Sequence, residues 1–508
     1  MLTIQGTSFI PVYCNILLLL VFVRIGWLHQ VVLCVILVDR KPNEFIFIFM
    51  KRVCLVIVLF VVFAASAYAS GSNEPKSIQN SNDPHEVIRA MLNEISADRI
   101  EANLLKLVSF HTRHTGSDTL SETTGIGAAR RWIYNEMQQY ARESGGRLQV
   151  EYHRFIQEPA RRIPVPTEIV NIVATLPGTQ SESTERIYVV SGHYDSICGD
   201  QGDVECYAPG ANDDASGTVA VMELARVMSK YEFDATIVFM AVAGEEQGLY
   251  GAHRWAQDAV DNGWDVHGMI TNDIIGSPVA DDGTIESHRV RLFAAGIPAL
   301  RENSTLVQAY LRTGGENDMP IRQLARHIKE VGERYVDGMH VDMIYRQDRY
   351  LRGGDHMAFV QRGFTAVRFS EPNENFRHQH QHVRTEDGAV YGDLLEYVDF
   401  EYIARVARVN GAALATLALA PAAPSDVRMV LRGLSNNTDL AWEANKEPDV
   451  AGYRVVWRET TSPVWQWSLD VGNVTEITME GISKDNYLFG VQAVDKHGFA
   501  SPAVYPLP

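Results

Sequence analysis

The chain has 508 residues, of which 46% are hydrophobic and 21% are charged, and this composition is typical of a globular protein. Its length is sufficient for two or three domains. The formal net charge is −18, which argues against nucleic acid as a partner because phosphate backbones bind basic surfaces.

The chain begins with apolar runs that have the character of a targeting region. MKRVCLVIVLFVVFAASAYAS (50–70) contains two basic residues, then an apolar stretch and then the small-residue sequence AYA (67–69). This order is that of a secretory signal, and it predicts a secreted or periplasmic protein. The alternative is a membrane anchor, but each apolar run is shorter than the roughly 20 residues that a helical span needs. We therefore expect no stable membrane span in the mature chain.

Regular periodicity begins after a polar linker at 70–85, which is rich in Ser, Asn and Pro. Further along, predicted strands alternate with predicted helices, and this alternation predicts an α/β fold with a mostly parallel sheet flanked by helices. The expected strands lie at 148–156, 168–178, 187–192, 235–243, 267–276 and 363–371, and the main expected helices at 128–146, 216–231, 249–260, 301–314, 320–332 and 392–418.

The pattern changes again after APAAPS (420–425), which is a linker by composition. Only short strands follow, and they predict a small all-β sandwich with Trp442 and Tyr453 as candidate core residues. The expected organisation is a targeting region at 1–69 with the signal peptide at about 50–69, a linker at 70–85, an α/β domain at 86–419 and a β-sandwich at 424–508.

Two cysteines, Cys198 and Cys206, lie beyond the expected cleavage site. In an exported chain, two cysteines this close in sequence predict a disulfide across the loop at 196–210. The alternative is a pair of free thiols.

Potential metal ligands follow the predicted strands of the α/β domain. In an open α/β sheet, ligands bind at the carboxyl ends of the strands, so side chains placed there are expected to converge. The candidates are His193, Asp195, Asp213, Asp214, Glu245, Glu246, Asp273 and the histidines of ENFRHQHQH (374–382).

The donor types in this set are imidazole and carboxylate, which suit zinc, with cobalt or manganese as alternatives. Two histidines and three carboxylates are enough for two metals that share one carboxylate. Paired metals about 3.5–4 Å apart stabilise both ends of a hydrolytic displacement. The adjacent pair Glu245 and Glu246 fits this chemistry, because one carboxylate can hold a metal while its neighbour acts on water.

Each motif also has a simpler explanation when taken alone. An Asp pair before a helix is usually an N-cap, and a Glu pair is usually on a solvated face. A run such as HQHQH is often a surface tract. The ordered combination at successive strand ends is what favours a metal site.

The motifs HYDS (193–196), APGANDDASG (208–217), AGEEQGLYG (243–251) and GGDHMAF (353–359) resemble those of the co-catalytic zinc aminopeptidases of peptidase clan MH. The bacterial leucyl aminopeptidases are the reference type. The resemblance covers about 86–418, so it implies that the expected α/β domain is a zinc peptidase domain. It also implies two Zn²⁺ ions as cofactors and peptide or protein substrates.

The resemblance assigns a role to each matching residue. His193, Asp213, Glu246, Asp273 and a late histidine would bind the metals, with Asp213 bridging both ions. Glu245 would be the general base, and Asp195 would orient His193. Asp214 would shape the turn at Asp213. His356 matches a family position near the substrate pocket, with a purely structural role as the alternative.

The last histidine departs from the family pattern, which has a single His followed by Thr and an Asp four residues further on. Here His378, His380 and His382 are all candidates, and none has an Asp four residues later. We favour His380, with His382 next.

These expectations describe a secreted di-zinc aminopeptidase that hydrolyses N-terminal residues from peptides. The alternatives are a carboxypeptidase or dipeptidase of the same clan, a glutaminyl cyclotransferase-like enzyme with one zinc, and a receptor-like binding protein. The spacing of LAWEANKEPDVAGYRVVWR (440–458) and YLFGVQAVDKHGFAS (487–501) resembles that of a fibronectin type III domain. The resemblance implies adhesion or spacing rather than chemistry, with a polymer, a cell surface or no ligand at all as the alternatives.

Overall fold

The structure, a computed structural model, describes residues 3–12, 16–25, 28–37, 75–297 and 305–508. Residues Met1–Ser72 and Asn73–Pro508 form two separate compact units. In the first unit, the described residues form an antiparallel sheet of β1 (Thr3–Val12), β2 (Ile16–Ile25) and β3 (Leu28–Leu37). The signal peptide expected at about 50–69 lies outside the described residues.

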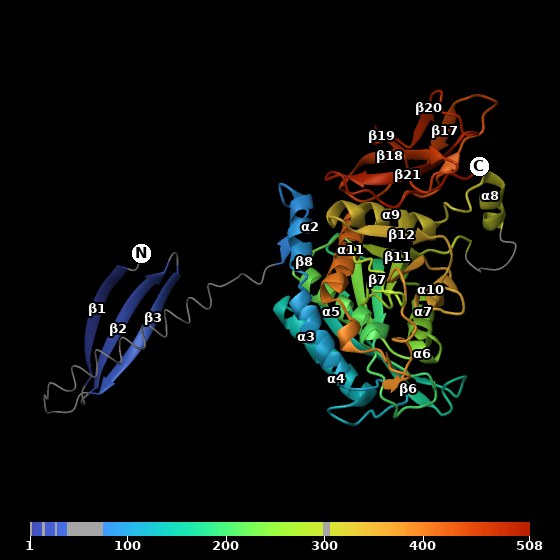
Figure 1. Cartoon of the computed structure of the whole chain (residues 1–508). Helices are drawn as coiled ribbons and strands as arrows, with labels where there is room; N and C mark the ends of the chain where they lie inside the picture. Colours follow the sequence, from blue (N-terminus) through green and yellow to red (C-terminus); the bar gives the residue numbers. More distant parts are fainter. Residues whose placement is uncertain (1–2, 13–15, 26–27, 38–74, 298–304) are drawn as a thin grey trace. The chain divides into compact units, whose positions relative to one another are not determined.

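An eight-stranded sheet forms the centre of the second unit. Its strands are β5 (Gln149–Gln157), β6 (Thr167–Leu176), β7 (Arg186–His193), β9 (Thr236–Val242), β10 (Asp265–Asn272), β11 (Arg289–Phe293), β12 (His340–Ile344) and β13 (Ala366–Ser370). They lie in the order β12-β11-β13-β10-β7-β9-β6-β5 (Figure 1). The central strands β13, β10, β7 and β9 are parallel, and antiparallel pairings join β11 to β13 and β6 to β9 and β5. The predicted α/β fold with a mostly parallel mixed sheet is confirmed.

Helices cover both faces of this sheet. They are α2 (Pro84–Asn93), α3 (Ala97–Val108), α4 (Gly125–Glu143), α5 (Ser216–Met228), α7 (Tyr250–Asn262), α9 (Pro320–Tyr335), α10 (His356–Val360) and α11 (Phe400–Leu419). Helix α8 (Thr305–Thr313) packs elsewhere, with Tyr310 stacked on Tyr505. Helices α5 and α11 lie on one side of the sheet, and α7 and α10 on the other (Figure 1). Among the described residues, no helix has the length and apolar character needed to cross a membrane.

Short polar side chains determine where several helices begin. The Asp83 carboxylate accepts a hydrogen bond from the backbone N–H of Glu86 at the start of α2. The Asp399 carboxylate accepts one from the backbone N–H of Tyr402. The second cap explains why α11 begins at Phe400, whereas the sequence pattern predicted a start at 392.

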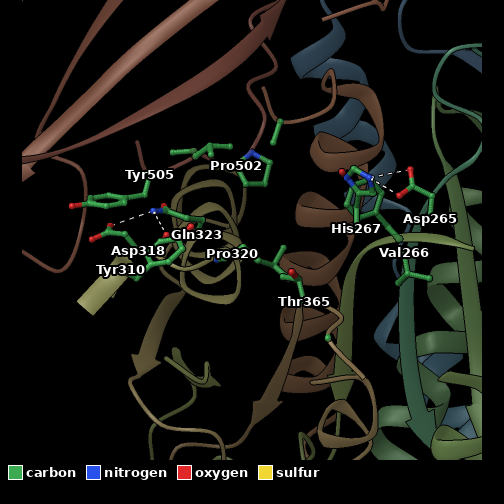
Figure 2. A pocket seen from close by; sticks show the side chains of 16 residues that line it. Asp265, Val266, His267, Tyr310, Asp318, Pro320, Gln323, Thr365, Pro502 and Tyr505 are labelled. Carbon is green, nitrogen blue, oxygen red and sulfur yellow. Dashed lines mark hydrogen bonds and ion pairs between the residues drawn. The ribbon is translucent and has the colours of Figure 1, made fainter. Parts of the chain in front are cut away.

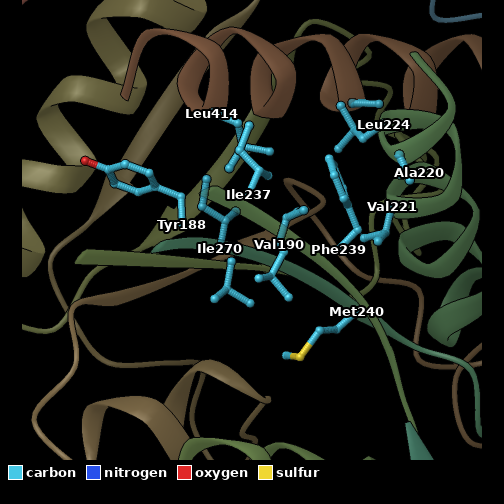
Figure 3. Close-up of a cluster of buried hydrophobic side chains, with 14 of the residues drawn as sticks. Tyr188, Val190, Ala220, Val221, Leu224, Ile237, Phe239, Met240, Ile270 and Leu414 are labelled. Carbon is cyan, nitrogen blue, oxygen red and sulfur yellow. The ribbon is translucent and has the colours of Figure 1, made fainter. Parts of the chain in front are cut away.

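The core lies between the parallel strands and the helices α5 and α11 (Figure 3). Val190 of β7, Phe239 of β9 and Ile270 of β10 are buried together with Leu224 of α5 and Leu414 of α11. Parallel strands are covered on both faces, which is why β9 is an unbroken apolar run, TIVFMAV. This packing fixes the positions of the strand ends.

Residues after the α11 helix form two small sheets, in agreement with the predicted β-sandwich. One contains β16 (Arg428–Met429), β17 (Thr438–Ala441) and β20 (Glu476–Met479), and the other contains β18 (Val450–Glu459), β19 (Trp467–Gly472) and β21 (Tyr487–Asp495). Trp442 and Tyr453, the predicted core aromatics, are both buried in the cluster that the two sheets share, with ring centroids 5.2 Å apart.

A buried ion cluster joins these sheets to the larger domain. The Asp318 carboxylate, fully buried before α9, lies 3.1 Å from Arg326 Nη1 and 2.7 Å from Nη2 of Arg458 in β18. Figure 2 shows Asp318 and Tyr505 at one end of a hollow of about 310 Å³ that residues of both parts line. Asp265 and His267 lie at its other end, 3.0 Å apart. None of the predicted metal ligands lines this hollow.

Candidate metal centre

The predicted site residues lie together at the carboxyl-terminal edge of the parallel strands. His193 is the last residue of β7, and Asp273 directly follows β10. Glu245 and Glu246 open the short helix α6 (Glu245–Gly248) after β9. Asp213 lies in the turn η1 (Ala211–Ala215) that leads into α5. Thus chain connectivity alone brings ligands from three adjacent strands to one edge of the sheet.

The Asp213 carboxylate faces a different histidine with each oxygen. Its Oδ1 is 3.2 Å from His193 Nε2, and its Oδ2 is 3.0 Å from His380 Nε2. His380 Nε2 is also 3.0 Å from Glu246 Oε2, and His193 Nε2 is 3.9 Å from Asp273 Oδ1. Two donor sets result, and they share Asp213. The first adds His193 and Asp273, and the second adds His380 and Glu246.

Burial and unpaired atoms fit metal binding at these sets. His193, Asp213, Glu246 and Asp273 are each at most 5% exposed, and burying such polar groups is costly unless they are paired or bind a metal. His193 Nε2 and Glu246 Oε1 are buried without a hydrogen-bond partner. Imidazole and carboxylate donors of this kind suit zinc. The residues present therefore fit two zinc ions.

The charges of the cluster shift several pKa values. Burial would raise the pKa of Asp213, but His380 and His193 outweigh it and hold that pKa well below its usual range. Burial raises the pKa of Glu245 well above its usual value, and the nearby Asp273 and Glu246 carboxylates add to the rise. A carboxylate with a raised pKa is suited to accept a proton from water. Glu245 Oε2 lies 4.0 Å from His193 Nε2, further than the ligand candidate Asp213.

Asp195 supports this centre through more of its atoms than the sequence suggested. Its carbonyl oxygen lies 3.1 Å from His193 Nδ1, and its carboxylate Oδ1 lies 3.6 Å from the same nitrogen. Its Oδ2 accepts a hydrogen bond of 3.1 Å from the backbone N–H of Glu246. The residue therefore lies against both the first histidine and the start of the glutamate turn.

Asp214 shapes the turn at Asp213, as the resemblance implied. Its Oδ2 accepts a hydrogen bond of 2.9 Å from the backbone N–H of His193, and its Oδ1 one of 2.9 Å from that of Gly217. A side chain at Gly217 would lie 2.3 Å from the Asn272 carbonyl and 2.5 Å from the Asp214 carboxylate. The glycine therefore allows this close packing. The peptide bond between Asp213 and Asp214 is cis.

Two acidic residues that the sequence did not single out hold the same turn. The Asp393 carboxylate accepts hydrogen bonds from the backbone N–H groups of Asn212 and Asp213, at 2.7 and 2.6 Å. Burial raises the pKa of Asp393 to about 7. The Glu371 carboxylate accepts a hydrogen bond of 2.8 Å from the Asn212 side chain. No local motif marks either residue, since each acts across a long stretch of sequence.

A buried arginine holds the Asp273 carboxylate. Arg368 of β13 places its Nη2 2.7 Å from Asp273 Oδ1 and its Nη1 3.1 Å from Asp348 Oδ2. Asp355 is buried nearby with Oδ1 unpaired, and burial raises its pKa to about 7. The contact with Arg368 fixes Oδ1 of Asp273, the oxygen that faces His193.

The three candidate late histidines occupy different surroundings. His380 lies beside Asp213 and Glu246, as described above. His378 stacks on Tyr397, with ring centroids 3.6 Å apart, and His382 is exposed. Only His380 of the three therefore lies at the carboxylates. His356 is buried, with Nε2 2.8 Å from the Gln347 carbonyl, and it holds the loop before α10.

The predicted disulfide between Cys198 and Cys206 is confirmed. It closes the loop that carries Asp200 and Gln201. Gln201 lines a cavity of about 480 Å³ at the metal centre, together with Asp213, Glu245, Glu246, Asp273 and His380. A second hollow of about 820 Å³ shares Gln201 and Arg162 with the first. The cluster therefore opens into an extended cleft.

Comparison with known proteins agrees with this geometry. The family model "Peptidase family M28" matches residues 171–389. A probable zinc metalloprotease of Pyrenophora teres f. teres is 50% identical over 426 residues, which cover 84% of this chain and 88% of that protein. One of Leptosphaeria maculans is 51% identical over 425 residues, which cover 84% and 98%.

Solved structures match at lower identity. LapB from Legionella pneumophila is 17% identical with a TM-score of 0.47, and the match covers 68% of this chain and 78% of that one. A Porphyromonas gingivalis glutaminyl cyclase is 14% identical with a TM-score of 0.42, covering 63% and 97%. The curated relatives define the class of protein, which is a zinc metalloprotease. Within that class, the chain belongs to peptidase family M28.

Proposed function

We propose that this protein is a secreted di-zinc aminopeptidase that removes N-terminal residues from peptides. The single observation that carries the proposal is the position of Asp213, whose two oxygens face His193 and His380 at 3.2 and 3.0 Å. A carboxylate shared in this way suits two metal ions a short distance apart. Asp273 and Glu246 would each complete one donor set.

Zinc bound at the two sets would lower the pKa of a water and polarise the scissile carbonyl. Glu245 would take the proton of that water during attack on the carbonyl carbon and deliver it to the leaving amine. The position of Glu245 supports this role, because it is largely buried beside the donor sets with its Oε2 4.0 Å from His193 Nε2. Asp195 and Asp214 would keep His193 and the Asp213 turn in place.

The shape of the cleft supports a peptide substrate. The cavity at the metal centre has room for an amino-terminal residue, and the adjoining hollow at Arg162 and Gln201 has room for the residues that follow. Leu249, Leu351 and Met357 line the first cavity and offer apolar contact to a substrate side chain.

Two further parts of the proposal concern export and the C-terminal sandwich. Export is supported by the signal-like sequence at about 50–69 and by the disulfide, which is typical of oxidising compartments. A fibronectin type III assignment for the C-terminal sandwich is supported by its two sheets, β16-β17-β20 and β19-β18-β21, packed around Trp442. Contact with a surface or polymer through this sandwich would follow from that assignment.

Purified zinc-loaded protein tests the aminopeptidase assignment with three substrates of the same sequence. We expect release of the first residue from a free peptide and from its C-terminal amide, and no release from the N-acetylated peptide. Cleavage of the acetylated peptide with loss of its last residue would replace the proposal with a carboxypeptidase. Cyclisation of an N-terminal glutamine without hydrolysis would replace it with a cyclotransferase.

A further inference from the structure

Three arginines line the cavity at the metal centre, in a chain whose net charge is −18. They are Arg162, Arg349 and Arg352. Arg349 is already neutralised, because its Nη1 lies 2.8 Å from Glu374 Oε2 and its Nε 3.3 Å from Asp348 Oδ1. The other two differ, since no carboxylate oxygen of the described residues lies within 4.0 Å of either guanidinium.

Arg162 reaches the cleft from an irregular segment between β5 and β6. Its Nη1 donates a hydrogen bond of 2.7 Å to the Glu246 carbonyl, which anchors the side chain beside the second donor set. Its Nε is buried and has no hydrogen-bond partner. The guanidinium thus retains donors that the described protein atoms do not satisfy, at the junction of the two hollows.

Arg352 lies on the loop between β12 and α10, which also borders the cavity. Its Nη2 is 3.2 Å from Gln379 Oε1, and its Nη1 is 3.4 Å from His380 Nδ1. If His380 binds a metal through Nε2, its proton resides on Nδ1. An N–H group cannot accept a hydrogen bond, so Arg352 would then keep only the contact with Gln379 and would be available to a ligand in the cavity.

Both arginines lie on the same side of the centre, since Arg162 contacts the Glu246 carbonyl and Arg352 contacts His380. Arg368, by contrast, is paired with Asp273 and Asp348. The guanidinium groups of Arg162 and Arg352 are therefore the cavity cations that remain available to a carboxylate of a ligand.

Resting on the proposed peptidase function, we propose that Arg162 and Arg352 bind a carboxylate of the substrate next to the scissile bond. Guanidinium groups pair with carboxylates through two parallel hydrogen bonds, which gives both strength and direction. The carboxylate can come from an acidic side chain flanking the scissile bond or from the free C-terminus of a dipeptide. The structure thus assigns to this cleft a preference for acidic peptides or dipeptides over neutral ones.

Three substrates that share the best-cleaved N-terminal residue, X, and a fourth that begins with glutamate distinguish these sources. X-glycinamide is the neutral reference. X-glycine adds a terminal carboxylate. X-glutamic acid α-amide adds a side-chain carboxylate on the residue after the scissile bond, and glutamyl-glycinamide has a side-chain carboxylate on the residue before the scissile bond. We expect kcat/KM for at least one of the three to exceed that for X-glycinamide about tenfold or more. This preference should decrease with increasing ionic strength.

Variants connect the preference to the two arginines. Arg162→Gln and Arg352→Gln should each reduce the ratio of kcat/KM between the preferred and neutral substrates, mainly through KM, and Arg352→Lys should restore part of it. Arg346→Gln is the matched control, because Arg346 is on the same loop but its guanidinium stacks 3.6 Å from the Tyr350 ring centroid and does not line the cavity. Zinc content measured on each variant shows that its centre is intact.

The outcomes separate the two proposals. If X-glycinamide is hydrolysed and none of the three acidic substrates has a higher kcat/KM, the carboxylate site is overturned and the proposed peptidase function is retained. A preference that neither glutamine variant changes would also overturn it. Hydrolysis of none of the four substrates by zinc-loaded protein would refute the proposed peptidase function, and the carboxylate site with it.

Discussion

The adjacent glutamates provide the most informative substitution, because their predicted roles differ while their chemistry is the same. Glu246 Oε2 lies 3.0 Å from His380 Nε2, within the second donor set. The Glu245 carboxylate lies further from the histidines, with Oε2 4.0 Å from His193 Nε2. Glutamine preserves the size of either side chain and removes its charge. Glu245→Gln should therefore keep both metals, whereas Glu246→Gln should weaken one site.

The magnitude follows from the role of a general base, which contributes roughly 10²–10⁴-fold to a rate. Glu245→Gln should lower kcat by that factor, or about 3–5 kcal/mol in the activation free energy, with little change in KM. The assay is steady-state hydrolysis of an aminoacyl amide, with zinc per chain measured on the same samples. Near wild-type kcat in Glu245→Gln, or equal metal loss in both variants, would refute the assigned roles.

Two further predictions concern stability. Asp318→Asn would leave the buried Arg326 and Arg458 without their carboxylate, and it should lower the free energy of unfolding, measured with denaturant, by about 3–5 kcal/mol. The control Glu476→Gln removes an exposed ion pair and should change the free energy of unfolding little. Equal effects of the two variants would contradict a stabilising role of the ion cluster. Burial raises the pKa of Asp234 from 3.8 to about 7, so the folded chain holds that proton more tightly, and its contribution to stability is complete below pH 3.8 and is lost as the pH rises toward 7. Asp234→Asn should therefore stabilise the protein at pH 8, by at most about 4 kcal/mol, and not at pH 3.5; the same shift at both pH values would exclude this cause.

The sequence predicted the central sheet well because its parallel strands are buried on both faces. Runs such as IVFMAV in β9 (237–242) are apolar throughout, and a short run of this kind is typical of a strand covered on both faces. Strands β11 and β12 were missed. They are five residues long and contain charged residues, as in RVRLF, so neither length nor hydrophobicity distinguishes them from loop.

The candidate ligands His193, Glu246 and Asp273 could be grouped from sequence because each lies at or just after the end of a strand, and strand ends converge in this fold. His380 lies in a loop, and the sequence alone could only rank it above His378 and His382. The supporting residues Asp393, Glu371 and Arg368 could not be found, because each reaches the centre from a segment far from its partner and carries no motif. Their roles depend on tertiary packing.

The measurement that tests the central claim most directly is the zinc content of the purified protein after equilibration with zinc and removal of the excess. The sharing of Asp213 between His193 and His380 predicts two zinc ions per chain, and Asp213→Asn should lose affinity for both. One ion per chain in the wild-type protein would contradict the bridged centre and favour a mono-zinc, cyclotransferase-like enzyme. No bound zinc would contradict a metal centre at these residues altogether.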